Sequence, residues 1–160
     1  MSKRDLSHID RDGSAQMVDV THKNDTVRVA RATGAIRMNA ATLSAIKKNT
    51  VEKGDVIAVS RVAGILAGKR TAELIPLCHP LPLTDLQVTL SPDETLPGLQ
   101  AEAVAKTVGK TGVEMEAITA VAVSLITVYD MVKAIDKTMV ISDVMLQEKH
   151  GGKGGSWTRE

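Results

Sequence analysis

The sequence predicts an α+β domain with an antiparallel sheet and helices packed on one of its faces. Strand-like and helix-like segments follow in the order strand, helix, helix, strand, strand, helix, strand, which is typical of that class. The chain has 160 residues, 43% of them hydrophobic and 24% charged, as expected of one soluble domain. Only 1% are aromatic, with one Tyr, one Trp and no Phe, so we expect an aliphatic core.

The first half of the chain is predicted to form one strand and two helices. Residues 26–38 are rich in β-branched residues and alternate between two faces, which indicates a strand with Gly34 as a candidate bulge. Asn39 is a suitable N-cap for a helix over residues 40–49. A second helix is predicted over residues 56–73, where apolar residues recur at helical spacing.

This second helix has a cap, an apolar side and two small residues. Asp55 precedes it and is a suitable N-cap. Gly64 and Gly68 lie four residues apart, so we expect a neighbouring backbone to approach the helix closely. Its larger apolar residues are Val59, Val62, Ala63 and Leu66.

The second half of the chain is predicted to form three strands and the longest helix. The loop at residues 75–83 contains three prolines, which exclude a regular helix and stiffen the segment. Residues 86–90 and 100–107 are predicted to form paired strands joined by a loose turn. Residues 113–134 have the strongest helical pattern, and residues 139–147 are predicted to form the last strand.

Composition divides the chain into three parts. We expect a flexible N-terminal segment over residues 1–14, a single α+β domain over residues 15–149, and a flexible Gly/Lys tail over residues 150–160. The net charge of +1 argues against a protein that coats nucleic acid or an anionic membrane. The one cysteine, Cys78, excludes an internal disulfide and a Cys-rich metal site. The N-terminus lacks an apolar signal segment, so we expect a cytoplasmic protein.

The long helix carries a carboxylate and an amine, Asp130 and Lys133, which share a face. An exposed ion pair is the plain interpretation. Because the preceding turns are apolar, we expect partial burial, which would tune either group for proton transfer. Glu116 precedes Asp130 on the same helix by roughly 21 Å along its axis. If both are functional, either the ligand is long or a second subunit supplies one of them.

Two short motifs are further candidates. Cys78 and His79 are poorly placed as a metal or nucleophile–base pair, because adjacent side chains point apart. A buried thiol beside a surface His, and a rigid loop that presents both to a ligand, both remain open. Residues 109–111 (GKT) have Val104 where a P-loop needs glycine, which excludes that motif. A lysine before a helix N-terminus still suits a phosphate, although a plain turn is the simpler interpretation.

Four isolated cations complete the candidates: Arg28, Lys53, Lys149 and Lys153. Any one of them alone is best interpreted as solvated surface. Together they suit a polyanion smaller than nucleic acid, such as a nucleoside triphosphate. The glycines around Lys153 would let that segment fold over such a ligand, the alternative being a disordered tail.

Six blocks of the sequence resemble the cyclic pyranopterin monophosphate synthase (MoaC) family of molybdenum cofactor biosynthesis. The resemblance extends over about residues 7–155, and its two longest blocks are too specific to arise by chance. The tail departs from the family pattern at His150 and Gly154, where small polar residues are more usual. The blocks are residues 8–10 (HID), 17–20 (MVDV), 53–56 (KGDV), 75–81 (IPLCHPL), 109–117 (GKTGVEMEA) and 129–131 (YDM).

The resemblance implies a ferredoxin-like catalytic domain in a homohexamer, a trimer of dimers with active sites between subunits. The implied substrate is 3′,8-cyclo-7,8-dihydroguanosine 5′-triphosphate, and the products are cyclic pyranopterin monophosphate and pyrophosphate. Neither a cofactor nor a metal site is implied. Whether Mg²⁺ accompanies the triphosphate is left open.

The resemblance also implies a role for ten residues. Asp130 would be the catalytic acid or base, with Lys133 and Lys53 beside it in catalysis. Arg28 and Lys149 would hold phosphates. The residues lining the substrate pocket would be Leu77, Cys78, His79, Met115 and Glu116.

Two other functions remain as alternatives. A non-catalytic nucleotide-binding module would bind triphosphates resembling GTP without converting the cyclic intermediate. A structural subunit of a larger complex would show a large exposed apolar patch and no pocket lined by Lys53, His79 and Asp130.

Overall fold

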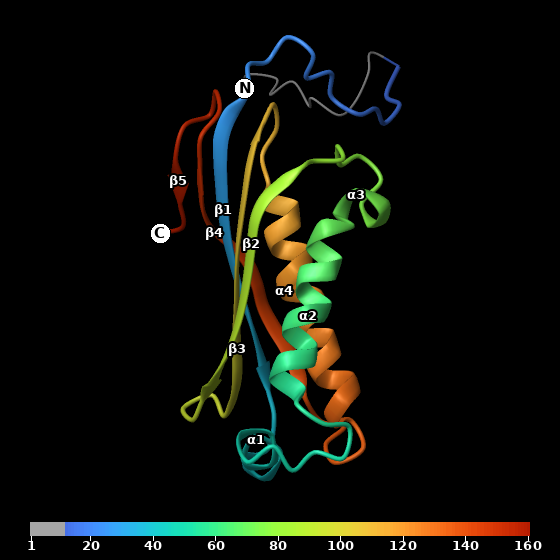
Figure 1. Ribbon diagram of the computed structural model, residues 1–160, viewed down its shortest axis with the longest axis vertical. Coiled ribbons are helices and arrows are strands. Elements are labelled where there is room, and N and C mark those ends of the chain that lie inside the picture. Colours follow the sequence, from blue (N-terminus) through green and yellow to red (C-terminus); the bar gives the residue numbers. More distant parts are fainter. Residues whose placement is uncertain (1–11) are drawn as a thin grey trace.

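A computed structural model describes residues 12–160, which form one sheet and two layers (Figure 1). Residues 1–11 of the predicted N-terminal segment, including the block at residues 8–10, lie outside the described residues. The strands are β1 (Thr26–Arg37), β2 (Leu83–Asp93), β3 (Gly98–Gly109), β4 (Val140–His150) and β5 (Trp157–Thr158). The helices are α1 (Ala40–Lys47), α2 (Val56–Lys69), α3 (Thr71–Leu74) and α4 (Glu114–Val132).

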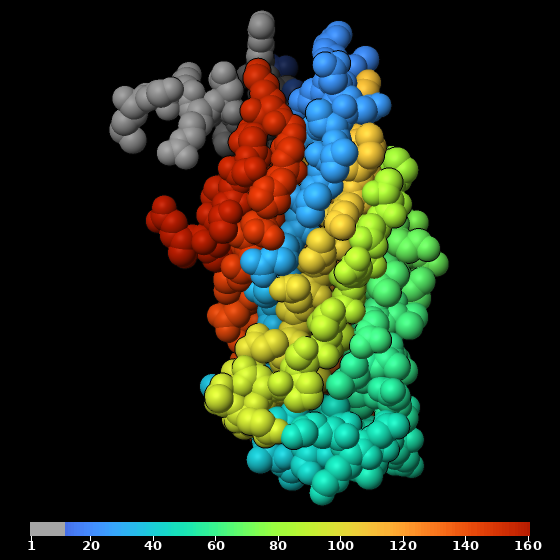
Figure 2. Space-filling view, turned by 60° about the vertical axis from the view of Figure 1, so that its left-hand side comes forward, coloured from blue at the N-terminus to red at the C-terminus, as the bar shows by residue number. Residues whose placement is uncertain are grey.

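The strands form an antiparallel sheet in the order β2-β3-β1-β4-β5. Helices α2 and α4 pack side by side on one face of it (Figure 1). Figure 2 shows β4, β1, β3 and β2 side by side on the face turned away from these helices. The first four strands and the two long helices have the ferredoxin-like arrangement, so the predicted fold class is confirmed.

The two predicted helix caps are present. The Asn39 side chain accepts a hydrogen bond from the Thr42 amide at 2.7 Å and so caps α1. The Asp55 carboxylate accepts one from the Ala58 amide at 2.9 Å and so caps α2. Each cap satisfies an amide that the first helical turn leaves free.

The single helix predicted over residues 56–73 is wrong, because the chain breaks it at Arg70 into α2 and α3. The Thr71 hydroxyl donates to the carbonyls of Gly68 (3.0 Å) and Ala67 (3.4 Å). A side chain that takes these carbonyls competes with the helical hydrogen bonds, and Gly68 is itself a weak helix former.

Gly34 serves close packing rather than a bulge in its own strand. The register of β1 against β4 shifts between Arg31 and Ala32 and again between Thr33 and Ala35, across Gly34, but the extra residues lie in β4, where Asp143 has a φ of 55°. A Cβ at Gly34 would lie 2.8 Å from Val121 and 2.9 Å from Leu125 of α4. Glycine therefore lets α4 lie directly on the centre of the sheet.

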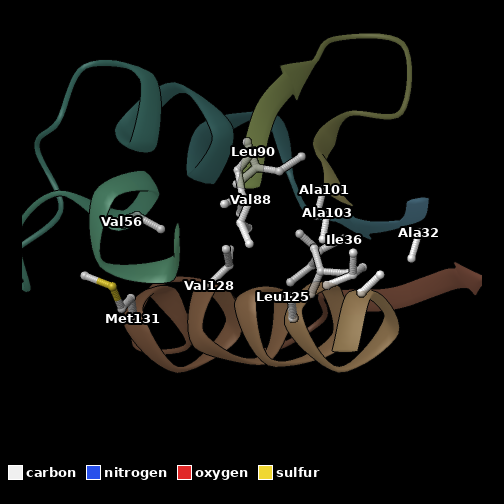
Figure 3. Close-up of a cluster of buried hydrophobic side chains, with 14 of the residues drawn as sticks. Ala32, Ile36, Val56, Val88, Leu90, Ala101, Ala103, Leu125, Val128 and Met131 are labelled. Carbon is white, nitrogen blue, oxygen red and sulfur yellow. The ribbon is translucent and has the colours of Figure 1, made fainter. Parts of the chain in front are cut away.

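The core between sheet and helices is aliphatic, as predicted (Figure 3). Alanines on β1 and β3, among them Ala32 and Ala103, point from the sheet toward Leu125 of α4 and are fully buried. Alanines and larger aliphatic side chains from both the strands and the helices fill this space, and the buried cluster itself, within residues 12–160, contains no aromatic ring. Helix α4 has the length and hydropathy of a membrane span, but 56% of its most apolar stretch is buried, as in a core helix.

Helix α2 packs on α4 through its small residues. A Cβ at Gly64 would lie 2.8 Å from the Ala120 carbonyl oxygen, so the close approach that the glycine spacing predicted is confirmed. The larger apolar side of α2 faces outward, because Val59, Val62 and Leu66 are 46%, 56% and 49% exposed. A single chain therefore leaves an apolar helix face without cover among the described residues.

Part of the segment predicted as a tail forms strand β5. It pairs with the end of β4, with Trp157 opposite Lys149 and Thr158 opposite Glu148. The Arg159 side chain donates to the Leu146 carbonyl oxygen at 2.8 Å. These contacts place the glycine-rich residues 151–155 in the turn between two strands.

Asp136 joins the segment after α4 to the start of α1. Its carboxylate is buried and accepts hydrogen bonds from the Asn39 amide (2.9 Å), the Thr138 amide (2.9 Å), the Thr138 hydroxyl (2.8 Å) and the Thr42 hydroxyl (3.5 Å). We expect Asp136→Ala to lower the free energy of unfolding by roughly 3 kcal/mol, because it leaves these donors without an acceptor. Urea unfolding at neutral pH measures the change, and Asp136→Asn, which keeps one acceptor oxygen, should lose less.

The pH dependence gives a second test of this interaction. The hydrogen bonds from the Asn39 amide and from Thr138 lower the pKa of Asp136. The ionised Asp136 carboxylate therefore stabilises the fold fully above the ordinary carboxyl pKa, and this stabilisation is lost as pH falls through the lowered pKa of Asp136. The difference in the free energy of unfolding between wild type and Asp136→Ala should shrink in acid. A difference that stays constant with pH would contradict this account.

Candidate active site

The five predicted pocket residues come together at the N-terminal end of α4. Leu77, Cys78 and His79 from the proline-rich loop and Met115 and Glu116 from α4 line a pocket of about 400 Å³. Val18, Val20 and Lys23, from the segment that precedes β1, line another side of it. The loop is fastened to β3, because the Thr107 hydroxyl donates to the Pro82 carbonyl oxygen at 2.7 Å. The structure therefore brings the five predicted residues together in one pocket.

His79 holds residues 18–23 against the pocket. Its Nε2 lies 2.8 Å from the Val18 carbonyl oxygen, and because a carbonyl only accepts, Nε2 carries the proton. A neutral His79 therefore has Nδ1 left as an acceptor. Burial, and to a lesser degree the Glu116 carboxylate, raise the pKa of Cys78, so its thiol is a poor nucleophile at neutral pH. The arrangement favours a rigid loop that presents polar groups to a ligand.

Glu116 is the buried carboxyl group of the pocket. Only 5% of the residue is exposed, and this burial, together with the charge of Glu114, raises its pKa. A carboxyl with a raised pKa is suited to hold a proton that a ligand accepts through a hydrogen bond. Met115 beside it is partly exposed and adds apolar surface to the pocket wall.

The raised pKa predicts how Glu116 affects stability. The folded chain binds the proton more tightly than the unfolded chain, so stability falls as pH rises from the ordinary carboxyl range through the raised pKa. Glu116→Gln removes this penalty. We expect the free energy of unfolding of Glu116→Gln relative to wild type to rise between pH 4 and pH 7 in urea titrations. A relative stability that falls over this range would contradict burial of the charge.

The two predicted phosphate cations lie at this same end. Arg28 donates to the carbonyls of Gly109 (2.9 Å) and Lys110 (3.1 Å) and so shapes the turn before α4. Lys149 forms an ion pair with Glu114 at 2.8 Å. Lys110 donates to the Thr21 carbonyl oxygen at 2.9 Å, which binds residues 18–23 from a second side.

Seven of the twelve lining residues were not among the predicted pocket residues, and three of these seven have polar or charged side chains: Lys23, Thr111 and Glu114. Lys23 forms no ion pair within residues 12–160, and no local pattern distinguishes it from a surface lysine. Thr111 and Glu114 lie in the block at residues 109–117, so their position beside Met115 and Glu116 was a usable signal.

The three predicted catalytic residues form a second cluster at the C-terminal end of α4. The Asp130 carboxylate lies 2.8 Å from Lys133 Nζ and 3.0 Å from Lys53 Nζ, and Lys53 also donates to the Asp130 carbonyl oxygen at 2.9 Å. The hydrogen bonds from Lys133 and Lys53 lower the pKa of Asp130, and Asp130 raises that of Lys133. At neutral pH the ionised Asp130 carboxylate therefore lies between two lysine side chains.

The expected partial burial of Asp130 and Lys133 is wrong for the single chain. Their side chains are 56% and 52% exposed, and that of Lys53 is 48% exposed. The reason is position: Asp130 and Lys133 lie at the very end of α4, where the apolar residues of the preceding turns already face the core.

The two clusters do not meet within one chain. The pocket lies at the start of α4 and the Asp130 cluster at its end, beside the turn between α1 and α2 (Figure 1). The helical rise places Glu116 and Asp130 roughly 21 Å apart along the axis. No three His, Cys, Asp or Glu side chains in the described part of the chain are placed to hold a metal ion.

The comparison with known families concerns nearly the whole chain. A family model described as "MoaC family" matches residues 17–152. The chain belongs to the MoaC family. The matched residues of this MoaC chain include all ten predicted site residues.

Curated relatives agree with this membership. A protein of Dinoroseobacter shibae named cyclic pyranopterin monophosphate synthase is 55% identical over 155 residues, which cover 97% of this chain and 98% of that protein. Proteins of the same name from Brucella ovis (54% over 152 residues; 95% and 92%) and Cereibacter sphaeroides (55% over 150 residues; 94% of each) are similarly close. The resemblance inferred from six sequence blocks is thus confirmed.

Proposed function

We propose that the chain is the lyase that converts 3′,8-cyclo-7,8-dihydroguanosine 5′-triphosphate to cyclic pyranopterin monophosphate and pyrophosphate in molybdenum cofactor biosynthesis. Membership in the MoaC family and the shared name of the relatives support this activity. The observation that carries it is the presence of two complementary clusters, a cation-rimmed pocket and an Asp–Lys–Lys centre.

The chemistry fits these groups. The reaction opens one ring, closes another and forms a cyclic phosphate, so it consists of proton transfers and the departure of pyrophosphate. Asp130 accepts and returns protons while Lys133 and Lys53 supply them and neutralise developing negative charge. Arg28 and Lys149 hold phosphates. His79, Cys78, Leu77, Met115 and Glu116 bind the pterin-forming part of the substrate.

We propose no redox cofactor, because none of these steps changes an oxidation state that the protein must balance. Mg²⁺ bound to the triphosphate is compatible with the scheme. The proposal places the enzyme in the cytoplasm.

The proposal includes an assembly of identical chains, a hexamer built as a trimer of dimers with active sites between subunits. Two observations support it. The pocket and the Asp130 cluster lie too far apart to act on one small substrate from the same helix. The outward face of α2, with Val59, Val62 and Leu66 exposed, is the kind of apolar surface that subunit contacts cover.

The test is turnover of the cyclic triphosphate, measured as pyrophosphate release and as formation of the cyclic monophosphate. The expected result is stoichiometric formation of both products. A nucleotide-binding module would bind the triphosphate and release nothing, and a structural subunit would not bind it. Either result would contradict the proposed function.

A further inference from the structure

The Glu114 carboxylate forms an ion pair with Lys149, the lysine that the proposed function assigns to a substrate phosphate. Glu114 Oε1 lies 2.8 Å from Lys149 Nζ, with 26% and 38% of the two side chains exposed. The pair joins the first residue of α4 to the end of β4. It is half-shielded from solvent, so its attraction is stronger than that of a fully exposed surface pair.

The backbone is built to accept this position of the carboxylate. Glu114 folds back over Gly112, and a Cβ at Gly112 would collide with Glu114 Oε2 and lie 2.6 Å from Glu114 Cδ. Because glycine has no Cβ, Gly112 leaves the space that the Glu114 carboxylate fills. Both residues line the pocket, so the carboxylate lies at the pocket wall.

The other cations at this end are not neutralised in the same way. Arg28 is bound by two backbone carbonyls, and Lys23 forms no ion pair within residues 12–160. Lys149 alone among these three is held by a carboxylate of the pocket. A phosphate that reaches Lys149 must therefore displace an anion already in place.

We propose that Glu114 is a positioning and specificity residue that occupies Lys149 while the site is empty and gives way only to a multiply charged phosphate group. The inference rests on the proposed function, because it takes Lys149 as a phosphate ligand. A competing carboxylate lowers the affinity for every anion. A singly charged anion gains too little from Lys149 to displace Glu114. A di- or triphosphate also contacts Lys23 and Arg28, and these contacts offset the loss of the ion pair between Glu114 and Lys149.

The first experiment measures binding of inorganic pyrophosphate to the full chain by isothermal titration calorimetry. Glu114→Gln removes the competing charge at nearly constant shape, so we expect pyrophosphate to bind on the order of tenfold more tightly than to wild type. Inorganic phosphate, which is too small to engage Lys149, Lys23 and Arg28 together, should gain more affinity than pyrophosphate, so that the preference of the chain for pyrophosphate over phosphate narrows. An unchanged or weaker affinity of Glu114→Gln for pyrophosphate would overturn the inference, as would a failure of both chains to bind it.

Three variants control this result. Glu94→Gln breaks the exposed pair of Glu94 with Lys47 far from the pocket and should leave the affinity unchanged. Lys149→Met in the Glu114→Gln background should remove the gain. Gly112→Ala keeps the glutamate but pushes its carboxylate off Lys149, so we expect it to raise the pyrophosphate affinity as Glu114→Gln does. Circular dichroism checks that each variant is folded.

The single tryptophan gives an independent readout. Trp157 is the cross-strand partner of Lys149, so the arrival of pyrophosphate at Lys149 should change its fluorescence, and Lys149→Met should abolish the change. Binding is measured without turnover, which separates the two hypotheses. A wild-type chain that turns over the cyclic triphosphate while Glu114→Gln shows no gain contradicts this inference alone. A chain that shows the gain but no turnover contradicts the proposed function.

Discussion

Replacing Asp130 with asparagine is expected to slow pyrophosphate release from the cyclic triphosphate by about a thousandfold, the scale of general acid–base catalysis. The carboxylate lies within hydrogen-bonding distance of both Lys53 and Lys133, and the hydrogen bonds from these residues lower its pKa, so it is ionised at neutral pH and has room to accept a proton. Asparagine keeps the shape and loses both the charge and the ability to accept a proton. A single-turnover measurement with excess enzyme isolates the chemical step that forms pyrophosphate from the later dissociation of products.

The matched control is Asp85→Asn. Asp85 also forms an exposed ion pair with a lysine, Lys106 at 3.5 Å, but it lies on β2 and is part of neither the pocket lining nor the Asp130 cluster. Its variant should react at the wild-type rate. Exposed ion pairs contribute little to stability, so both variants should remain folded. An Asp130→Asn chain that reacts as fast as wild type would remove Asp130 from the catalytic scheme.

The fold could be predicted from the sequence because its signals are local. Alternation within residues 26–38 and the caps Asn39 and Asp55 act over a few residues, and each produced the expected element. The break at Arg70 could not be predicted in this way, because it depends on whether the Thr71 hydroxyl bonds to the helix carbonyls or to solvent. Strand β5 depends on pairing with β4 across a glycine-rich turn, which a two-residue strand does not reveal.

The site could be predicted in its residues and only partly in its arrangement. Helix geometry alone predicted the large distance between Glu116 and Asp130 along α4. It could not show which cation joins which carboxylate, because Lys53 and Asp130 lie 77 residues apart in the chain and Lys149 and Glu114 lie 35 apart. The exposure of Asp130 also followed from tertiary packing, which decides where the core ends along α4.

The separation of the two clusters leads to the second large effect. Chains with Glu116→Ala and chains with Asp130→Asn should each be inactive, and their mixture should recover activity when the oligomers exchange subunits. If each site takes its pocket from one chain and its Asp130 cluster from another, random mixing at equal amounts restores about a quarter of the sites. Pyrophosphate release from the cyclic triphosphate measures the recovery.

The control mixture combines Glu116→Ala with the double variant Glu116→Ala/Asp130→Asn, in which no chain supplies Glu116, so no site is complete. Native mass spectrometry of chains with different tags establishes that exchange has occurred. Recovery in the first mixture only would mean that the two ends of α4 act from different subunits. Exchange without recovery would mean that each chain bridges its own two clusters, and since the helix fixes their separation, the substrate itself would then have to span it.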